Sequence, residues 1–243
     1  MIKGFLLGLQ FLTRLPVGKP IAFSTENLRM AISFFPIIGL VIGGIVAIPV
    51  VIIPFTEYRI AGLLSLLLYI WVTGGMHLDG VADVADGFFA NRDRERTLEI
   101  MKDSHIGAFG VIAIALVLLS KYILYAQLSL HPASIIVSMV IARWMAVAAI
   151  NWKKTAATGS GEMLRKARIG SRAVVLLVVL LFTLAVYNVY YLIAVAVSFF
   201  VMQWICRASD RAIRGITGDV LGTIVELCEI AALLSFWGVH LWT

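Results

Sequence analysis

The chain has 243 residues, of which 61% are hydrophobic and 14% are charged, and its mean hydropathy is +0.97. Soluble globular domains average about 45–50% apolar and about 25% charged residues, so this composition excludes an ordinary soluble protein and predicts a polytopic membrane protein. The formal net charge is +6, but the 20 basic residues form short clusters between long apolar stretches, which indicates membrane topology and argues against a nucleic-acid partner.

In chain order, residues 1–14 are expected to form a short interfacial helix. Seven apolar stretches then approach the roughly 17–25 residues that a membrane-spanning helix requires. We therefore predict an all-α fold, a polytopic helical membrane bundle with about seven transmembrane helices that forms a single domain over residues 1–243. Proline residues in or beside the first span predict a kink or a ragged end there. The predicted spans lie near residues 30–54, 60–78, 106–129, 132–151, 172–187, 189–206 and 220–241.

The basic residues predict the orientation of this bundle. With the N-terminus inside, all Lys and Arg residues except Arg59, Lys121 and Arg143 fall in cytoplasmic segments. Cytoplasmic loops carry the excess of Lys and Arg in membrane proteins. The sequence therefore predicts a multi-pass protein of the cell membrane, with the N-terminus inside and the C-terminus outside.

The first polar motif, GGMHLDGVADVADG at residues 74–87, follows the second predicted span on the cytoplasmic side. On a helix, Asp79, Asp83 and Asp86 at i, i+4 and i+7 fall within about 60° of one another. Three carboxylates on one face repel each other, and oxygen ligands of this kind suit Mg²⁺ or Mn²⁺. The alternative is a solvated helix end. For His77, a structural role is as compatible with the pattern as a catalytic one.

The second motif, NRDRERTLEIMKDSHIGAFGV, follows at once. Its arginines suit phosphate binding, because guanidinium groups bind phosphate in a bidentate manner. Asp103 and Ser104 lie where the chain turns back into the membrane, which favours a role in the site. The alternative is a solvated loop with salt bridges between its own residues. The third motif, RASDRAIRGITGDVLGTIVELCEI, places Asp219 at the cytoplasmic entrance of the last span.

Glu226 and Glu229 carry acid deeper along nearly the same face as Asp219. Carboxylates inside a membrane are costly and usually mark a polar cavity or a charge partner. Lys121 and Arg143 are the obvious partners, and a structural salt-bridge role is one interpretation. Together the motifs predict a metal-dependent site for phosphorylated substrates, in which a phosphoryl group is transferred directly to a hydroxyl.

Several segments resemble the adenosylcobinamide-GDP ribazoletransferase (cobalamin synthase) family. They are FLTRLPV at 11–17, FPIIGL at 35–40, residues 74–87, RTLEIMKDSHIGAFGV at 96–111 and ITGDVLGTIVELCE at 216–229. The resemblance implies an integral membrane enzyme that uses Mg²⁺. It also implies the reaction of adenosylcobinamide-GDP with α-ribazole, or its 5′-phosphate, to give adenosylcobalamin, or its 5′-phosphate, and GMP.

The motifs and the resemblance together predict individual roles at a site that faces the cytoplasm. The predicted metal ligands are Asp79, Asp83, Asp86 and Asp103, with Asp219 as an alternative to Asp103. The predicted catalytic residues are Asp83, Asp86 and His77, and the predicted substrate-binding residues are Arg94, Arg96, Lys102, Ser104 and Arg214. An oligomer is compatible with the sequence. The alternatives are a membrane phosphotransferase of the CDP-alcohol type and a secondary transporter.

Overall fold

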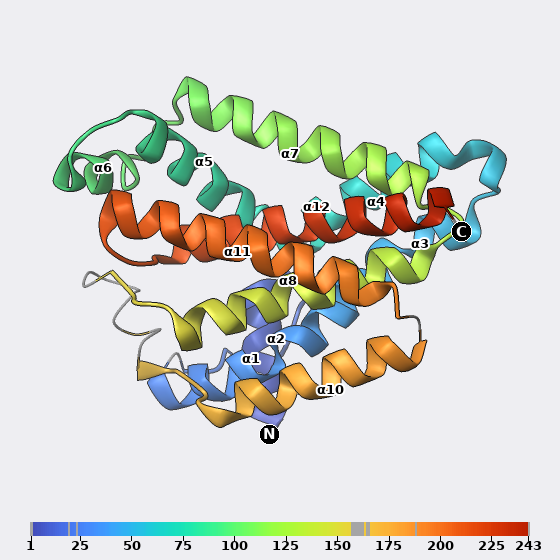
Figure 1. Ribbon diagram of the computed structural model, residues 1–243, viewed down its shortest axis with the longest axis horizontal. Helices are drawn as coiled ribbons and strands as arrows, with labels where there is room; N and C mark the ends of the chain where they lie inside the picture. The colour runs from blue at the N-terminus through green and yellow to red at the C-terminus, as the bar shows by residue number, and fades with distance from the viewer. Residues whose placement is uncertain are drawn as a thin grey trace.

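The computed structural model describes residues 2–18, 20–22, 24–156, 163, 166–187 and 189–242. The described part is an α-helical bundle, as predicted, with one isolated parallel bridge between Thr155 and Ile216. Its long helices run roughly along one common direction (Figure 1). The α-helices of the described part are α1 (Ile2–Leu12), α2 (Thr25–Val46), α3 (Ile48–Ile52), α4 (Tyr58–Thr73), α5 (Met76–Phe89), α6 (Arg94–Ile100), α7 (Ala108–Gln127), α8 (Pro132–Trp152), α10 (Ser171–Tyr187), α11 (Tyr191–Ile213) and α12 (Gly218–Trp242).

Six helical segments in the described part are long and apolar enough to cross a membrane, namely Thr25–Val46, Phe55–Thr73, Ala108–Gln127, Pro132–Trp152, Tyr191–Ile213 and Gly218–Leu241. The predicted span at 172–187 corresponds to α10, an apolar helix of 17 residues. This length is at the short end of the roughly 17–25 residues that span a bilayer. Together these helices agree with the predicted bundle of about seven spans.

Two predicted spans are divided between separate helices. The first ends at Val46 and continues as the separate helix α3, so the ragged end expected near its prolines is confirmed. The second, predicted over 60–78, is broken after Thr73, because Gly74 and Gly75 both adopt left-handed conformations with φ of 68° and 72°. Glycine adopts this conformation without the steric cost that other residues incur. The aspartates of the first motif therefore belong to a separate helix, α5.

The core lies around α8 and α12, the most buried of the apolar helices. In Figure 1, α12 runs through the middle of the bundle, while α7 and α10 lie at opposite edges. Small residues let the central helices approach closely: a Cβ at Gly39 of α2 would lie 2.6 Å from the carbonyl oxygen of Met139 in α8. Such contacts through small residues are the usual means of helix association in membranes.

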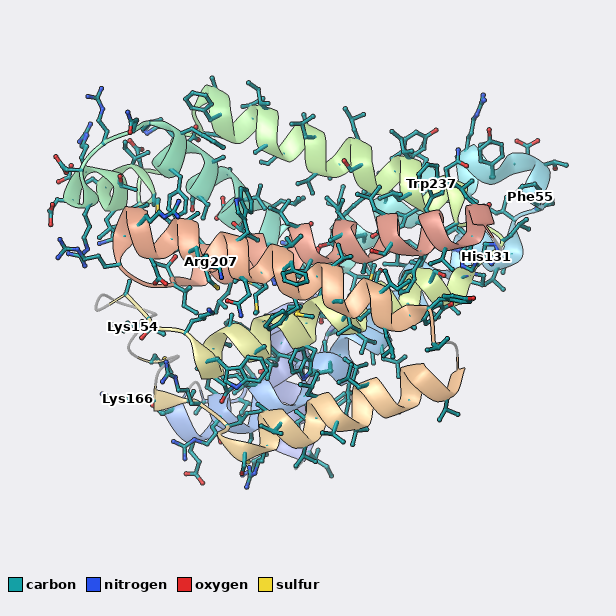
Figure 2. The ribbon with its side chains drawn as sticks, viewed as in Figure 1. Phe55, His131, Lys154, Lys166, Arg207 and Trp237 are labelled. Carbon is teal, nitrogen blue, oxygen red and sulfur yellow. The ribbon has the colours of Figure 1, made fainter. Side chains whose placement is uncertain are left out.

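The two ends of the bundle differ in charge. Figure 2 shows Lys154, Lys166 and Arg207 toward the end that also holds α6, and Phe55, His131 and Trp237 toward the opposite end. The asymmetry is the one on which the predicted orientation depends. The N-in, C-out topology itself stays a prediction.

Candidate active site

Helix α5 carries the three aspartates of the first motif, so they share one helix as predicted. The break before α5 is held in place by the segment that follows α1. The backbone N–H of Arg14 donates a hydrogen bond of 2.7 Å to the carbonyl of Val72, and the Arg14 side chain packs against Gly74. This bond gives the Val72 carbonyl, near the end of α4, the hydrogen-bond partner that a buried backbone group requires.

Asp219 approaches these aspartates from the facing helix, α12. A Cβ at Gly80 would lie 2.8 Å from the carbonyl oxygen and 2.9 Å from the Cα of Asp219, so the two backbones are in direct contact there. The Thr223 hydroxyl also donates a 3.1 Å hydrogen bond to the Gly80 carbonyl. The absence of a side chain at Gly80 is therefore what brings Asp219 beside Asp79 and Asp83.

The electrostatics of Asp83 report this gathering of carboxylates. Partial burial, together with the neighbouring carboxylates of Asp79 and Asp219, raises the pKa of Asp83 to about 7. Within the described residues, none of the ion pairs of the chain involves Asp79, Asp83 or Asp219. Neighbouring like charges that lack a counter-charge are typical of a site that binds a cation.

Asp86 is engaged differently. Its Oδ2 accepts a hydrogen bond of 2.7 Å from the backbone N–H of Gly107, and its Oδ1 accepts one of 2.9 Å from that of Gly110. These N–H groups belong to the first turn of α7, which has no side-chain cap of its own. Asp86 therefore caps α7 from a neighbouring helix and fixes the position of α5 against it.

The residues predicted around Asp103 lie in an exposed turn. Asp103 Oδ1 accepts hydrogen bonds of 3.0 Å from the backbone N–H and 2.7 Å from Nδ1 of His105, and the backbone bond above all holds the pKa of Asp103 below its usual range. Lys102 and Ser104 are exposed beside it. The structure thus brings Asp219, rather than Asp103, next to the carboxylates of α5.

The predicted phosphate-binding arginines divide into two groups. Arg94 is half-buried, and its Nε donates a 3.2 Å hydrogen bond to the carbonyl of Ile213, directly before Arg214. Arg94 and the exposed Arg214 therefore lie at the junction between α6 and the end of α11. Arg96 is exposed and pairs with Glu99 at 2.8 Å on its own helix.

His77 is buried two residues before Asp79 on α5. Gly222 of α12 lies against its backbone, where an added Cβ would be 3.3 Å from the His77 Cα. Its Nδ1 lies 3.9 Å from Glu226 and has no hydrogen-bond partner among the described residues. His77 therefore lies between the aspartates of α5 and the buried carboxylate of Glu226 in α12.

The carboxylates deeper in α12 pair with the two intramembrane cations, as predicted. Lys121 Nζ lies 2.6 Å from Glu226 Oε2 and 3.0 Å from Glu229 Oε1, and Arg143 Nη1 lies 2.7 Å from Glu229 Oε2. All four side chains are fully buried. Because two cations face two carboxylates, the network carries no net formal charge, which lowers the cost of burying ionised groups.

Arg143 is nevertheless incompletely paired. Its Nε and Nη2 are buried without hydrogen-bond partners among the described residues. A buried donor left in this state costs about 1–3 kcal/mol. Arg143 also borders a cavity of about 370 Å³, which Asp79, Asp219 and His77 border as well. From its sequence context, Arg143 is expected only as an ion-pair partner of the intramembrane carboxylates. Its position in the cavity wall depends on contacts between helices that are far apart in the chain.

The carboxylates fit a hard divalent cation in their chemistry, because all of the nearby donors are oxygens. As they stand, the described residues include no group of three His, Cys, Asp or Glu side chains close enough to hold an ion unaided. Mg²⁺ typically binds through one or two carboxylates together with water and substrate phosphates. Asp79, Asp83 and Asp219 are the residues that could hold such an ion jointly with a phosphorylated substrate.

Comparison with known proteins gives a consistent family. A family model described as cobalamin-5-phosphate synthase matches residues 4–237. The adenosylcobinamide-GDP ribazoletransferase of Treponema denticola is 38% identical over 260 residues, covering 99% of this chain and 100% of the relative. The proteins of that name from Caldanaerobacter subterraneus subsp. tengcongensis and Clostridium botulinum are 35% and 34% identical, over 97% and 96% of this chain and 98% and 97% of theirs. No solved structure matches the chain. The chain belongs to the cobalamin-5-phosphate synthase family.

Proposed function

We propose that the protein is a Mg²⁺-dependent membrane transferase acting in the last steps of cobalamin biosynthesis. It transfers the adenosylcobinamide phosphate moiety from adenosylcobinamide-GDP to α-ribazole, or its 5′-phosphate, and releases GMP. The observation that carries this proposal is the meeting of Asp79, Asp83 and Asp219 beside a cavity, in a chain of this family. Such a site combines a place for a pyrophosphate with a place for the acceptor.

The three carboxylates would hold the metal ion. When bound, Mg²⁺ would neutralise the pyrophosphate oxygens and align the attacking hydroxyl with phosphorus. Asp219 is oriented for this by Thr217, whose hydroxyl donates a 3.3 Å hydrogen bond to Asp219 Oδ2. Asp86 helps to hold the three carboxylates in position, because it anchors α5 to the first turn of α7.

The transfer also moves a proton from the attacking ribose hydroxyl. Asp83, within the carboxylate group, would accept it, and the buried His77 that borders the same cavity is the alternative acceptor. Arg94 and Arg214, at the junction of α6 and α11, would bind the GMP part of the donor through its phosphate. The bond to phosphorus forms from the ribose oxygen as the bond to the GMP oxygen breaks.

The test is metal-dependent release of GMP by the purified full-length protein, incubated with adenosylcobinamide-GDP and α-ribazole. We expect Asp79→Asn, Asp83→Asn and Asp219→Asn each to lower turnover by at least about 100-fold, because each removes a charge that acts in the transition state. Asp103→Asn is the matched control, since its carboxylate is exposed and bonded within its own turn. Full activity in all three variants would rule out the proposed site, and turnover of a CDP-activated lipid in place of the corrinoid would rule out the proposed reaction.

We further propose that the site opens to the cytoplasm and that the protein resides in the cell membrane. The gathering of basic residues at the end of the bundle that holds α6 supports this orientation. Single cysteines introduced at Lys154 and at Phe55 provide the measurement in whole cells. A membrane-impermeant thiol reagent should modify the residue at position 55 and not the one at position 154.

A further inference from the structure

The cavity beside the carboxylates has one polar end that is open and one polar end that is closed. Asp79 is exposed and Asp219 is half-buried, whereas Arg143 and His77 are buried. Most of the remaining wall is apolar and includes Phe11 of α1 and Phe35 of α2. The rings of these two residues stack with centroids 6.0 Å apart and planes 12° apart. The cavity is therefore an apolar slot that leads from the carboxylates to a buried guanidinium group.

The closed end selects for a neutral ligand. The charge of Arg143 is already balanced by Glu229, and the wider network with Lys121 and Glu226 is neutral. An anion such as a phosphate would therefore find no excess positive charge there. Arg143 still has two buried N–H positions, Nε and Nη2, without partners among the described residues. A neutral hydrogen-bond acceptor on a ligand would give these N–H groups the partner that they lack.

The size of the cavity decides between the two substrates. A volume of about 370 Å³ lies at the low end of the roughly 300–1,000 Å³ of small-molecule sites. A corrinoid joined to a guanine nucleotide is far too large for it. The base of α-ribazole, a dimethylated benzimidazole, is flat and apolar, and it carries one free ring nitrogen that accepts a hydrogen bond.

We propose that this cavity binds the base of the acceptor nucleoside, with its free ring nitrogen accepting a hydrogen bond from Arg143. The apolar faces of the base pack against the wall that includes Phe11 and Phe35, and the ribose remains at the open end beside Asp79 and Asp219. This placement rests on the proposed function, and it explains how the attacking hydroxyl reaches the carboxylates. Arg143 is a binding residue in this arrangement.

The placement is tested by binding in the absence of turnover. The probes are 1,5,6-trimethylbenzimidazole and 1,5,6-trimethylindole, which differ only in the acceptor nitrogen. Each is titrated into the purified full-length protein with EDTA and without adenosylcobinamide-GDP. We expect the wild-type protein to bind the benzimidazole at least about tenfold more tightly, because a buried polar group that loses its partner discriminates strongly between ligands.

Two variants make the test specific. Arg143→Lys keeps a positive charge near Glu229 but removes the additional donors, so it should abolish the preference for the benzimidazole while the indole still binds. Arg59→Lys, an exposed substitution in the first turn of α4, is the matched control and should keep the preference. A bulky side chain in the cavity wall, Ala146→Phe, should weaken binding of both probes by at least about tenfold. Its result does not depend on Arg143.

The outcomes separate this inference from the proposed function. If wild-type protein releases GMP but binds the two probes equally, or if Ala146→Phe binds them as well as wild type, the placement of the base is overturned and the transferase activity stands. If the preference for the benzimidazole is present and depends on Arg143 while no GMP is released, the placement stands and the proposed reaction fails.

Discussion

Replacement of Gly80 by alanine should lower the turnover of the protein strongly without removing any catalytic group. The new Cβ would lie 2.8 Å from the Asp219 carbonyl oxygen, whereas ordinary contacts begin near 3.4 Å. Because the obstructing atoms are backbone, α5 and α12 must separate by at least about 0.6 Å, which exceeds the ~0.5 Å within which catalytic groups must be held. A displacement of this order costs up to about 100-fold in rate.

The stability of the Gly80→Ala variant should change much less than its activity. Overpacking costs about 1–3 kcal/mol. The gain from placing alanine instead of glycine in a helix is about 1 kcal/mol and offsets part of this. Gly238→Ala on α12 is the matched control, because nothing lies within 4 Å of its new Cβ. GMP release at saturating Mg²⁺ and thermal unfolding in detergent are the two measurements. Equal turnover of the two variants would refute the view that this helix contact positions the carboxylates.

Three other contacts of the described part give testable predictions. Glu229→Gln should lower the free energy of unfolding by about 3–5 kcal/mol, because it leaves buried cations uncompensated. Glu99→Gln, the control in an exposed ion pair, should lower the free energy of unfolding by no more than about 1 kcal/mol. Denaturant titration of the two variants measures both values. Asp86→Ala should lower the free energy of unfolding by about 0.5–2 kcal/mol, because α7 loses its cap. Amide hydrogen exchange at the start of α7 should become faster, and unchanged exchange there would contradict the capping role of Asp86. Arg94→Ala should raise the KM for adenosylcobinamide-GDP by roughly tenfold or more, since a hydrogen bond to a charged group contributes about 1.5–3 kcal/mol, while a change in kcat alone would argue against phosphate binding.

The helices and the common helix of the three aspartates were predictable because both depend on local patterns. Runs of apolar residues indicate spans, and spacing at i, i+4 and i+7 places Asp79, Asp83 and Asp86 on one face of any helix that contains them. The break at Gly74 and Gly75 was not predictable in the same way. Glycine is compatible with a continuous transmembrane helix, and here its left-handed conformation accompanies the docking of the Arg14 backbone on Val72.

The partners of the aspartates were harder to predict because they come from distant parts of the chain. Helical periodicity shows which face of a helix is polar, but it does not show which helix faces it. The contact between Gly80 and Asp219 depends on the packing of α5 against α12, and the capping of α7 by Asp86 depends on the loop that carries Gly107. The sequence therefore placed Asp103 among the predicted ligands with Asp219 as the alternative, whereas the three-dimensional arrangement brings Asp219 beside the carboxylates of α5.

The wall of the cavity has a consequence for the order in which the protein is assembled. Phe11 and Leu12 come from α1, and Leu221 and Val225 come from α12, which is synthesised much later than α1. Helix α1 can pack on α2 early, but the cavity has no complete wall until α12 has entered the bundle. An intermediate released before α12 is made would hold Asp79 and Asp83 without Asp219, so the site is absent until α12 has been synthesised.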